Sequence, residues 1–143
     1  IIILFTLNGC LYSPILSNKK YDFQFLKINS QGEKNINEII TNNLIRTGNG
    51  NKMYDINFFS KKVKEVISTN EKGDPTAFRI RITINYKLLE DNRILIKNDI
   101  SKKITYNNIS DKLELIKYEE NLINNLASNI SAEMLMSIAS LGK

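Results

Sequence analysis

The sequence predicts an α+β fold, a two-layer sandwich in which a four-stranded, mainly antiparallel sheet carries two helices on one face, in the order β-α-β-β-β-α. Three patterns point to it. Residues 78–88 alternate strictly between apolar and polar side chains, which is typical of a half-buried strand. A stripe of apolar residues at helical spacing covers the C-terminal segment, and a shorter one covers 33–47. A sheet with one apolar face needs helices to cover that face.

The composition limits both the architecture and the chemistry. The chain has 143 residues, 42% hydrophobic and 24% charged, which fits one packed domain over residues 21–143. One cysteine cannot form an internal disulfide, and the absence of histidine excludes His-based acid–base catalysis and the commonest zinc sites. We therefore expect no cofactor, no metal and no catalytic residue. The formal charge of +5 permits an anionic partner but does not identify one, because A/T-rich codons also favour lysine.

The amino-terminal segment is expected to be a membrane anchor. Residues 1–9 are uncharged and mostly apolar, as in the end of a secretory signal peptide, and they are too short to span a bilayer. Leu7-Asn8-Gly9-Cys10 resembles the bacterial lipobox, in which the cysteine is acylated and the preceding residues are removed. Residues 10–20 would then be the lipidated Cys10 and its tether. The alternative is a buried strand in which Cys10 is a small apolar residue.

The first half of the domain is predicted to contain two strands and one helix. A strand is expected at 21–28, a helix at 33–47 with Gly48 as a left-handed C-cap, and a long strand at 53–68. The polar cluster 69–75 contains Asn, Gly, Asp and Pro and predicts a turn.

The next two strands continue an antiparallel meander. In the segment 78–88 the even-numbered residues are apolar and predict the inner face, while the outer face carries Arg79, Arg81, Thr83, Asn85 and Lys87. Glu90-Asp91-Asn92 predicts a turn. The even-numbered isoleucines Ile94, Ile96, Ile100 and Ile104 then extend the inner face through a strand at 93–106.

The last segment is predicted to be one long helix. Asp111 is placed to cap the start of the helix, and Glu114, three residues later, is placed to form the second hydrogen bond of a capping box. Gly142 is expected to end the helix. About 30 residues at 1.5 Å rise give roughly 45 Å of helix. Its apolar stripe contains Leu115, Ile116, Leu122, Ile123, Leu126, Ile130, Met134, Ile138 and Leu141. With both helices on one side, the other sheet face is either solvated or held for a partner.

Several segments together resemble a known family. The run Asp74-Pro75-Thr76-Ala77-Phe78-Arg79, the alternating strand, the Ile104-Thr105-Tyr106-Asn107 step and the long C-terminal helix resemble the lipopolysaccharide-assembly lipoprotein LptE (the LptE/RlpB family) of Gram-negative bacteria, in its alphaproteobacterial form. The lipobox followed by Tyr12-Ser13-Pro14 fits the same family. Asn8 and the Asn- and Lys-rich surface depart from it.

The resemblance implies a role without catalysis. LptE-like proteins lie as a plug inside the LptD outer-membrane β-barrel, on the periplasmic side and lipid-anchored, and the pair inserts lipopolysaccharide into the outer leaflet. The outward set at 79–87 would supply the polar exterior that a barrel lumen requires, although a solvated sheet face explains it equally. Lys72, Arg79 and Lys112 are the expected lipopolysaccharide contacts, since cations bind phosphates and carboxylates. The alternative for each of the three is an ordinary surface cation without lipid contact.

Three other classes of function are considered for this sequence. A generic periplasmic lipoprotein would bind another protein or the cell wall through the exposed sheet face. A nucleic-acid binder of the RRM type is disfavoured, because the element order differs and no aromatic RNP-like motif lies on the third strand. An enzyme is disfavoured too, because the acidic pairs Glu90-Asp91 and Glu119-Glu120 are expected to be solvated and Ser and Thr lack a base.

Overall fold

The computed structural model describes residues 20–142. It contains β1 (Tyr21–Gly32), α1 (Lys34–Thr47), β2 (Gly48–Thr69), β3 (Pro75–Glu90), β4 (Arg93–Asn107) and α2 (Lys112–Ala139), followed by a short 3-10 turn at Ser140–Gly142. The predicted leader 1–9, the lipidation site Cys10 and nearly all of the tether lie outside the described residues.

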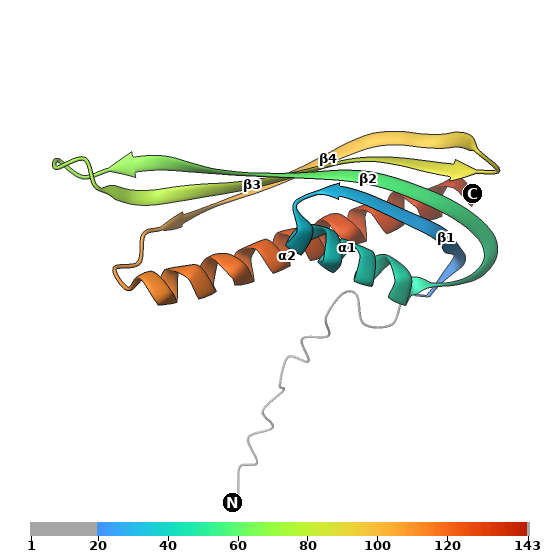
Figure 1. Ribbon diagram of the computed structural model, residues 1–143, viewed down its shortest axis with the longest axis horizontal. Coiled ribbons are helices and arrows are strands. Elements are labelled where there is room, and N and C mark those ends of the chain that lie inside the picture. Colours follow the sequence, from blue (N-terminus) through green and yellow to red (C-terminus); the bar gives the residue numbers. More distant parts are fainter. Residues whose placement is uncertain (1–19, 143) are drawn as a thin grey trace, which may run out of the picture.

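The four strands form one sheet in the order β1-β2-β3-β4. β1 and β2 are parallel and are connected by α1, whereas β2, β3 and β4 form an antiparallel meander. Both helices lie on the same side of the sheet (Figure 1). The predicted fold class is therefore confirmed, and no helix of residues 20–142 lies on the outer sheet face.

The core lies between the helices and the inner sheet face. The even-numbered residues of β3 from Phe78 to Leu88 are all buried, as their alternation predicts. α1 packs chiefly on β1 and α2, while α2 packs on β3 and β4. The helices contribute Ile36, Ile40, Leu44, Leu122, Ile123, Leu126, Ala127, Ile130, Met134, Leu135 and Ile138. No helix within residues 20–142 is both long enough and apolar enough to cross a membrane.

The connection from α1 to β2 differs from the prediction. Gly48 has φ −84°, so it is extended rather than a left-handed cap, and β2 begins there instead of at residue 53. The reason is a close approach of two strands. A Cβ at Gly48 would lie 3.0 Å from the Cα of Gln24 on β1, so the absence of a side chain lets β2 start directly beside β1.

The turn between β3 and β4 has the predicted chemistry, but one isoleucine after it lies on the face opposite to the predicted one. Asp91 and Asn92 both have positive φ, as a two-residue hairpin loop requires. Immediately after this loop the β3–β4 register shifts, so that Leu88 lies opposite Ile96 and Leu89 opposite Ile94. The extra residue between them turns Ile94 away from the core, and its side chain is 52% exposed.

The long helix also differs in detail. Asp111 caps α2 by accepting hydrogen bonds from the backbone N–H groups of Leu113 at 2.8 Å and Glu114 at 3.0 Å, which confirms the predicted start. Regular α-helix ends at Ala139, three residues before the predicted Gly142. Ile116 and Leu141, predicted to be part of the buried stripe, are 53% and 44% exposed.

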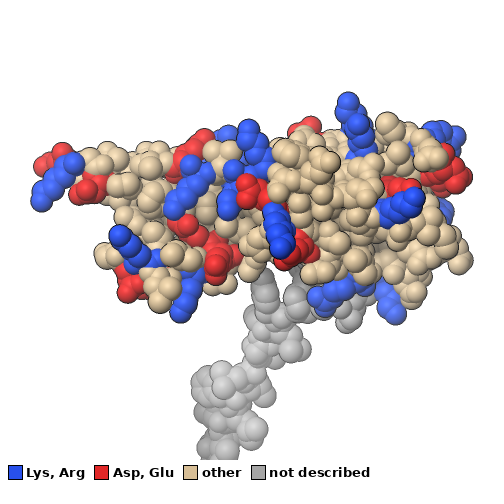
Figure 2. Space-filling model, viewed as in Figure 1, with Lys and Arg blue, Asp and Glu red and all other residues tan. Residues whose placement is uncertain are grey.

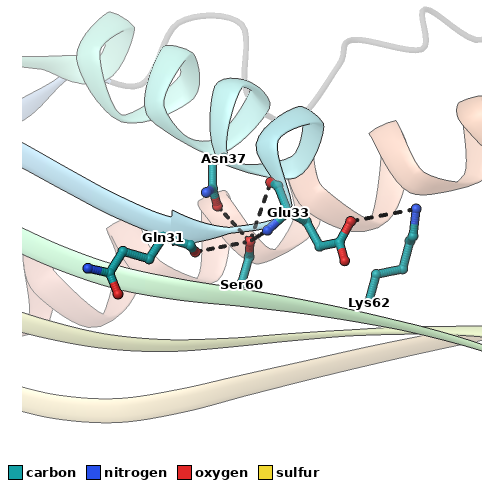
Figure 3. Close-up of polar contacts among 5 residues, drawn as sticks. All are labelled: Gln31, Glu33, Asn37, Ser60 and Lys62. Atoms are coloured by element: carbon teal, nitrogen blue, oxygen red, sulfur yellow. Dashed lines mark hydrogen bonds and ion pairs between the residues drawn. The ribbon is translucent and has the colours of Figure 1, made fainter.

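A buried hydroxyl fixes the turn from β1 into α1 (Figure 3). The Ser60 side chain on β2 is 1% exposed; its Oγ accepts a hydrogen bond from the Glu33 N–H at 2.8 Å and donates to Asn37 Oδ1 at 2.6 Å. Gly32, at φ +102°, lies against it, and a Cβ there would be 2.0 Å from the Ser60 carbonyl oxygen. The Glu33 carboxylate lies 3.8 Å from Lys62 Nζ. Ser60 thus satisfies the polar groups of the crossover that places α1 over the sheet.

Candidate functional site

One end of the molecule has the sheet covered by a single helix. We call it the distal end and define it as the β2–β3 hairpin from residue 62 to 78 together with the β4–α2 connection from 104 to 120. There α2 lies alone below the strands, and the hairpin extends beyond it (Figure 1). On β2, Ile56, Phe58 and Ser60 are buried, but the next inner-face residues Lys62, Lys64 and Val66 are exposed.

Large apolar side chains are exposed at this end. Val66 on β2 is 53% exposed, and Leu113 and Ile116 in the first turns of α2 are 62% and 53% exposed. The helix lengths explain why. α1 has 14 residues and α2 has 28, which correspond to about 21 Å and about 42 Å, so half of α2 has no neighbouring helix. The unequal helical patterns were visible in the sequence and would have identified this uncovered segment.

Lys72 lies in the hairpin turn, which its neighbours organise tightly. The Asn70 side-chain oxygen accepts hydrogen bonds from the N–H groups of Lys72 and Asp74, both at 2.9 Å, and Gly73 takes φ +85°. Lys72 is exposed, and it forms no ion pair with another described residue. Glu71 and Asp74 in the same turn reduce the positive potential around it.

Lys112 is held at the same end through the β4–α2 connection. Asn108 donates its backbone N–H to the Thr76 carbonyl at 2.8 Å and its side-chain amide to the Pro75 carbonyl at 2.8 Å. These two hydrogen bonds fix the start of α2 to the base of the β2–β3 hairpin. Lys112 is exposed directly after the capping residue.

Arg79 lies on the outer sheet face, not beside the other two predicted cations. Its guanidinium lies 3.9 Å from the Glu65 carboxylate, and its Nε–H donates to Thr105 Oγ1 at 3.3 Å. Arg81 lies 4.0 Å from the same carboxylate. The structure therefore brings Lys72 and Lys112 to one end but places Arg79 in a cross-strand ion cluster with Glu65.

An unpredicted polar cluster connects α2 to the sheet where the second helix is absent. Glu119 Oε1 accepts hydrogen bonds from Lys64 Nζ and the Tyr106 hydroxyl, each at 2.6 Å, and its side chain is only 17% exposed. The expectation that Glu119 is solvated is wrong; Glu120 is exposed as expected. Lys64 Nζ also lies 4.4 Å from the centre of the Phe78 ring. Burial and the hydrogen bond to Glu119 raise the pKa of Tyr106.

On the face of the molecule shown in Figure 2, basic and acidic side chains are interleaved rather than separated. The hairpin tip carries both signs, so the net positive charge does not form one continuous basic face in this view. The outer sheet face adds neutral polar pairs, such as Thr83 and Ser101 with hydroxyl oxygens 3.1 Å apart. In residues 20–142, no group of three or more acidic or cysteine side chains is placed to hold a metal ion.

Comparison with known proteins gives a structural result only. No family model matches the sequence, and no curated protein matches it. Among solved structures, the rare lipoprotein B from Shewanella oneidensis has a TM-score of 0.63 at 10% identity and covers 81% of this chain and 96% of its own. Lipoprotein B from Nitrosomonas europaea has a TM-score of 0.63 at 15% identity and covers 98% of this chain and 93% of its own.

A minor lipoprotein from Acinetobacter baumannii also shares the architecture, with a TM-score of 0.54 at 10% identity, covering 86% of this chain and 94% of its own. These likenesses extend over nearly the full length of each neighbour. At such low identities they establish a common fold.

Proposed function

We propose that this chain is an outer-membrane lipoprotein of the LptE type that plugs an LptD-like β-barrel and takes part in inserting lipopolysaccharide into the outer leaflet. The observation that carries the proposal is the fold, because solved lipoproteins B match it over 93–96% of their own length. The alphaproteobacterial form is part of the proposal and is supported by the sequence resemblance alone.

The distribution of polarity supports a plug. A domain enclosed in a barrel lumen must have its own core, since the lumen is polar and offers no apolar surface to bury against. Here the core is closed by the two helices, and the outer sheet face presents Arg79, Arg81, Thr83, Asn85 and Lys87, all at least partly exposed. The interleaved charges suit a lumen wall of mixed polarity.

The anchor in this proposal is Cys10. Two or more acyl chains hold a protein stably at a membrane, so acylated Cys10 would fix the domain to the periplasmic side of the outer membrane. Residues 11–20 would be the tether, and Lys20, the one tether residue that the structure describes, is exposed immediately before β1.

The distal end is the proposed lipid contact. Its exposed Val66, Leu113 and Ile116 suit acyl chains, and the exposed cations Lys72 and Lys112 suit the phosphates of the headgroup. Arg79 is a weaker contact than Lys72 or Lys112 in this proposal, because Glu65 already neutralises part of its charge.

Copurification tests the proposal. The full chain with a C-terminal tag is extracted from outer membranes in mild detergent, and mass spectrometry identifies bound proteins and the mature amino terminus. We expect an outer-membrane β-barrel protein at about one copy per chain and an acylated amino-terminal cysteine. A Cys10→Ser variant is the matched control and should lose the acyl mass and leave the membrane fraction.

Two results would overturn the proposal. An unmodified Cys10 with its leader retained would remove the anchor. An acylated monomer with no barrel protein would instead favour the alternative, a periplasmic lipoprotein that binds another protein or the cell wall through the open sheet face.

A further inference from the structure

The outer sheet face contains a shallow pocket of about 640 Å³, a volume within the range of small-molecule sites. Two rows of side chains across all four strands form it. One row is Asn29, Asn57, Lys87 and Lys97, and the other is Gln31, Phe59, Asn85 and Asp99. With neighbouring strands about 4.8 Å apart, each row spans about 14 Å.

An aromatic ring lies in the middle of the second row. Phe59 is 46% exposed and stands between Gln31 on β1 and Asn85 on β3. Its position on the outer face gives it no share of the core on the opposite side of the sheet. An apolar ring framed by polar groups offers a surface on which a flat, weakly apolar ligand face can stack.

The amides around the ring offer donors and acceptors together. Asn29 donates its side-chain N–H to Asn57 Oδ1 at 2.8 Å, and this hydrogen bond uses neither the Asn29 oxygen nor the Asn57 nitrogen. Gln31 and Asn85 are exposed on either side of Phe59. Groups that both donate and accept are suited to hydroxyls, which also do both.

Two lysines set the charge of the ligand. Lys87 and Lys97 lie directly opposite each other on β3 and β4, and neither forms an ion pair with a described residue. Like charges in that position destabilise a sheet, and an anion between them relieves the repulsion. Asp99 is the one carboxylate among the lining residues, so the pocket keeps a net positive charge.

From this arrangement we propose that the outer-face pocket binds a short acidic carbohydrate. A sugar ring stacks on Phe59, its hydroxyls bond to Asn29, Asn57, Gln31 and Asn85, and a carboxylate or phosphate lies between Lys87 and Lys97. The site needs neither the acyl anchor nor a barrel, so binding can be tested on the chain alone; its Asn85 and Lys87 also belong to the outer face that the plug proposal turns toward the lumen. The acidic sugar comes from a glycolipid headgroup or from a cell-wall glycan.

Titration calorimetry on the full chain in detergent tests the assignment. The probes are the deacylated core oligosaccharide of lipopolysaccharide, a muramic-acid-containing cell-wall disaccharide, neutral maltotriose and inorganic phosphate. At least one acidic sugar should bind about tenfold more tightly than maltotriose or phosphate. The tighter of the two acidic sugars identifies the source.

Matched variants locate the site. Phe59→Ala should weaken binding of the acidic sugar about tenfold, and Lys87→Gln with Lys97→Gln about fivefold, whereas Lys103→Gln, on the same face outside the pocket, should leave it unchanged. All these side chains are on the outer face, so unfolding temperatures should stay close to the parent value. The assignment is overturned if neither acidic sugar binds, if maltotriose or phosphate binds as tightly, or if the pocket variants bind like the parent chain.

Discussion

The half of the sheet under both helices and the distal end are built from the same strands but differ in what surrounds them. Under both helices, β2 buries Ile56, Phe58 and Ser60. Further along the same strand, Lys62, Lys64 and Val66 are exposed, because α1 does not reach them. The first region uses its side chains to hold the fold together. The distal end leaves apolar and cationic side chains available to other molecules.

We therefore expect substitutions under both helices to affect stability, and substitutions at the distal end to affect binding. A buried side chain loses its environment when changed, whereas one that is half exposed already contacts water. The effect of a substitution on the free energy of unfolding should therefore be largest in the doubly covered region and small at the distal end.

A charge in the doubly covered core should have the largest effect. Ile84 is 0% exposed on the inner face of β3, between Ser60 on β2 and Ile100 on β4, so Ile84→Asp buries an unpaired carboxylate and should cost about 5 kcal/mol or prevent folding. Asn85→Asp, at the next residue and exposed on the outer face, is the control and should change the free energy of unfolding by less than about 1 kcal/mol. Urea denaturation measures both. Equal effects would show that the inner face is misassigned.

The two positive-φ glycines allow the second comparison. Gly32→Ala would place a Cβ 2.0 Å from the Ser60 carbonyl oxygen, whereas nothing lies within 4 Å of a Cβ at Gly73 in the distal turn. Both substitutions cost about 1–2 kcal/mol of backbone strain, and the clash at Gly32 should bring the total there to about 4 kcal/mol. Thermal unfolding of the two variants measures the difference. A Gly32→Ala variant as stable as Gly73→Ala would contradict the tight crossover.

Truncation of one isoleucine in each region is the third comparison. Ile40 in α1 is 0% exposed, and Ile116 in α2 is 53% exposed. Ile40→Ala should cost about 3 kcal/mol by leaving a cavity, whereas Ile116→Ala should change stability by less than about 0.5 kcal/mol. Chemical denaturation of both variants under one condition is the measurement. A large loss at Ile116 would mean that the distal part of α2 belongs to the core.

The Tyr106–Glu119 contact should give the smallest effect, visible at high pH. Because folding raises the pKa of Tyr106 above its ordinary value of 10.0, the stability it contributes is complete below pH 10 and is lost as the pH rises further. The parent chain should lose about 1 kcal/mol per pH unit above pH 10 from this group. Tyr106→Phe, compared by unfolding at pH 8 and pH 11, should lack that part of the pH dependence. An identical pH dependence would contradict it.

Much of the fold follows from sequence pattern, and the exceptions have local causes. Alternation along β3 was sufficient to assign its inner face because a sheet has a period of two. The face of Ile94 was predicted wrongly because a register shift of one residue moves a side chain to the other face of the sheet. The cap at Gly48 was misjudged because glycine serves close approach as well as positive φ.

The candidate site was less predictable, because it depends on which elements end near one another. Lys72 and Lys112 lie at the same end of the molecule because the hydrogen bonds of Asn108 fix the start of α2 to the hairpin. Arg79 lies in an ion pair with Glu65, and Glu119 accepts hydrogen bonds from Lys64 and Tyr106. These partners are at least 13 residues apart in the sequence, and no local pattern predicts such contacts. Spacing along the chain gives the face of an element but not its tertiary partners.

One paired measurement tests most directly whether the distal end serves binding rather than folding. The double variant Leu113→Ser with Ile116→Ser is compared with the parent chain in urea denaturation and in binding to phosphatidylethanolamine vesicles that contain lipopolysaccharide. The free energy of unfolding should change by less than about 1 kcal/mol, while vesicle binding should weaken about tenfold. Unchanged vesicle binding, or a loss of stability of several kcal/mol, would contradict the division between the two regions.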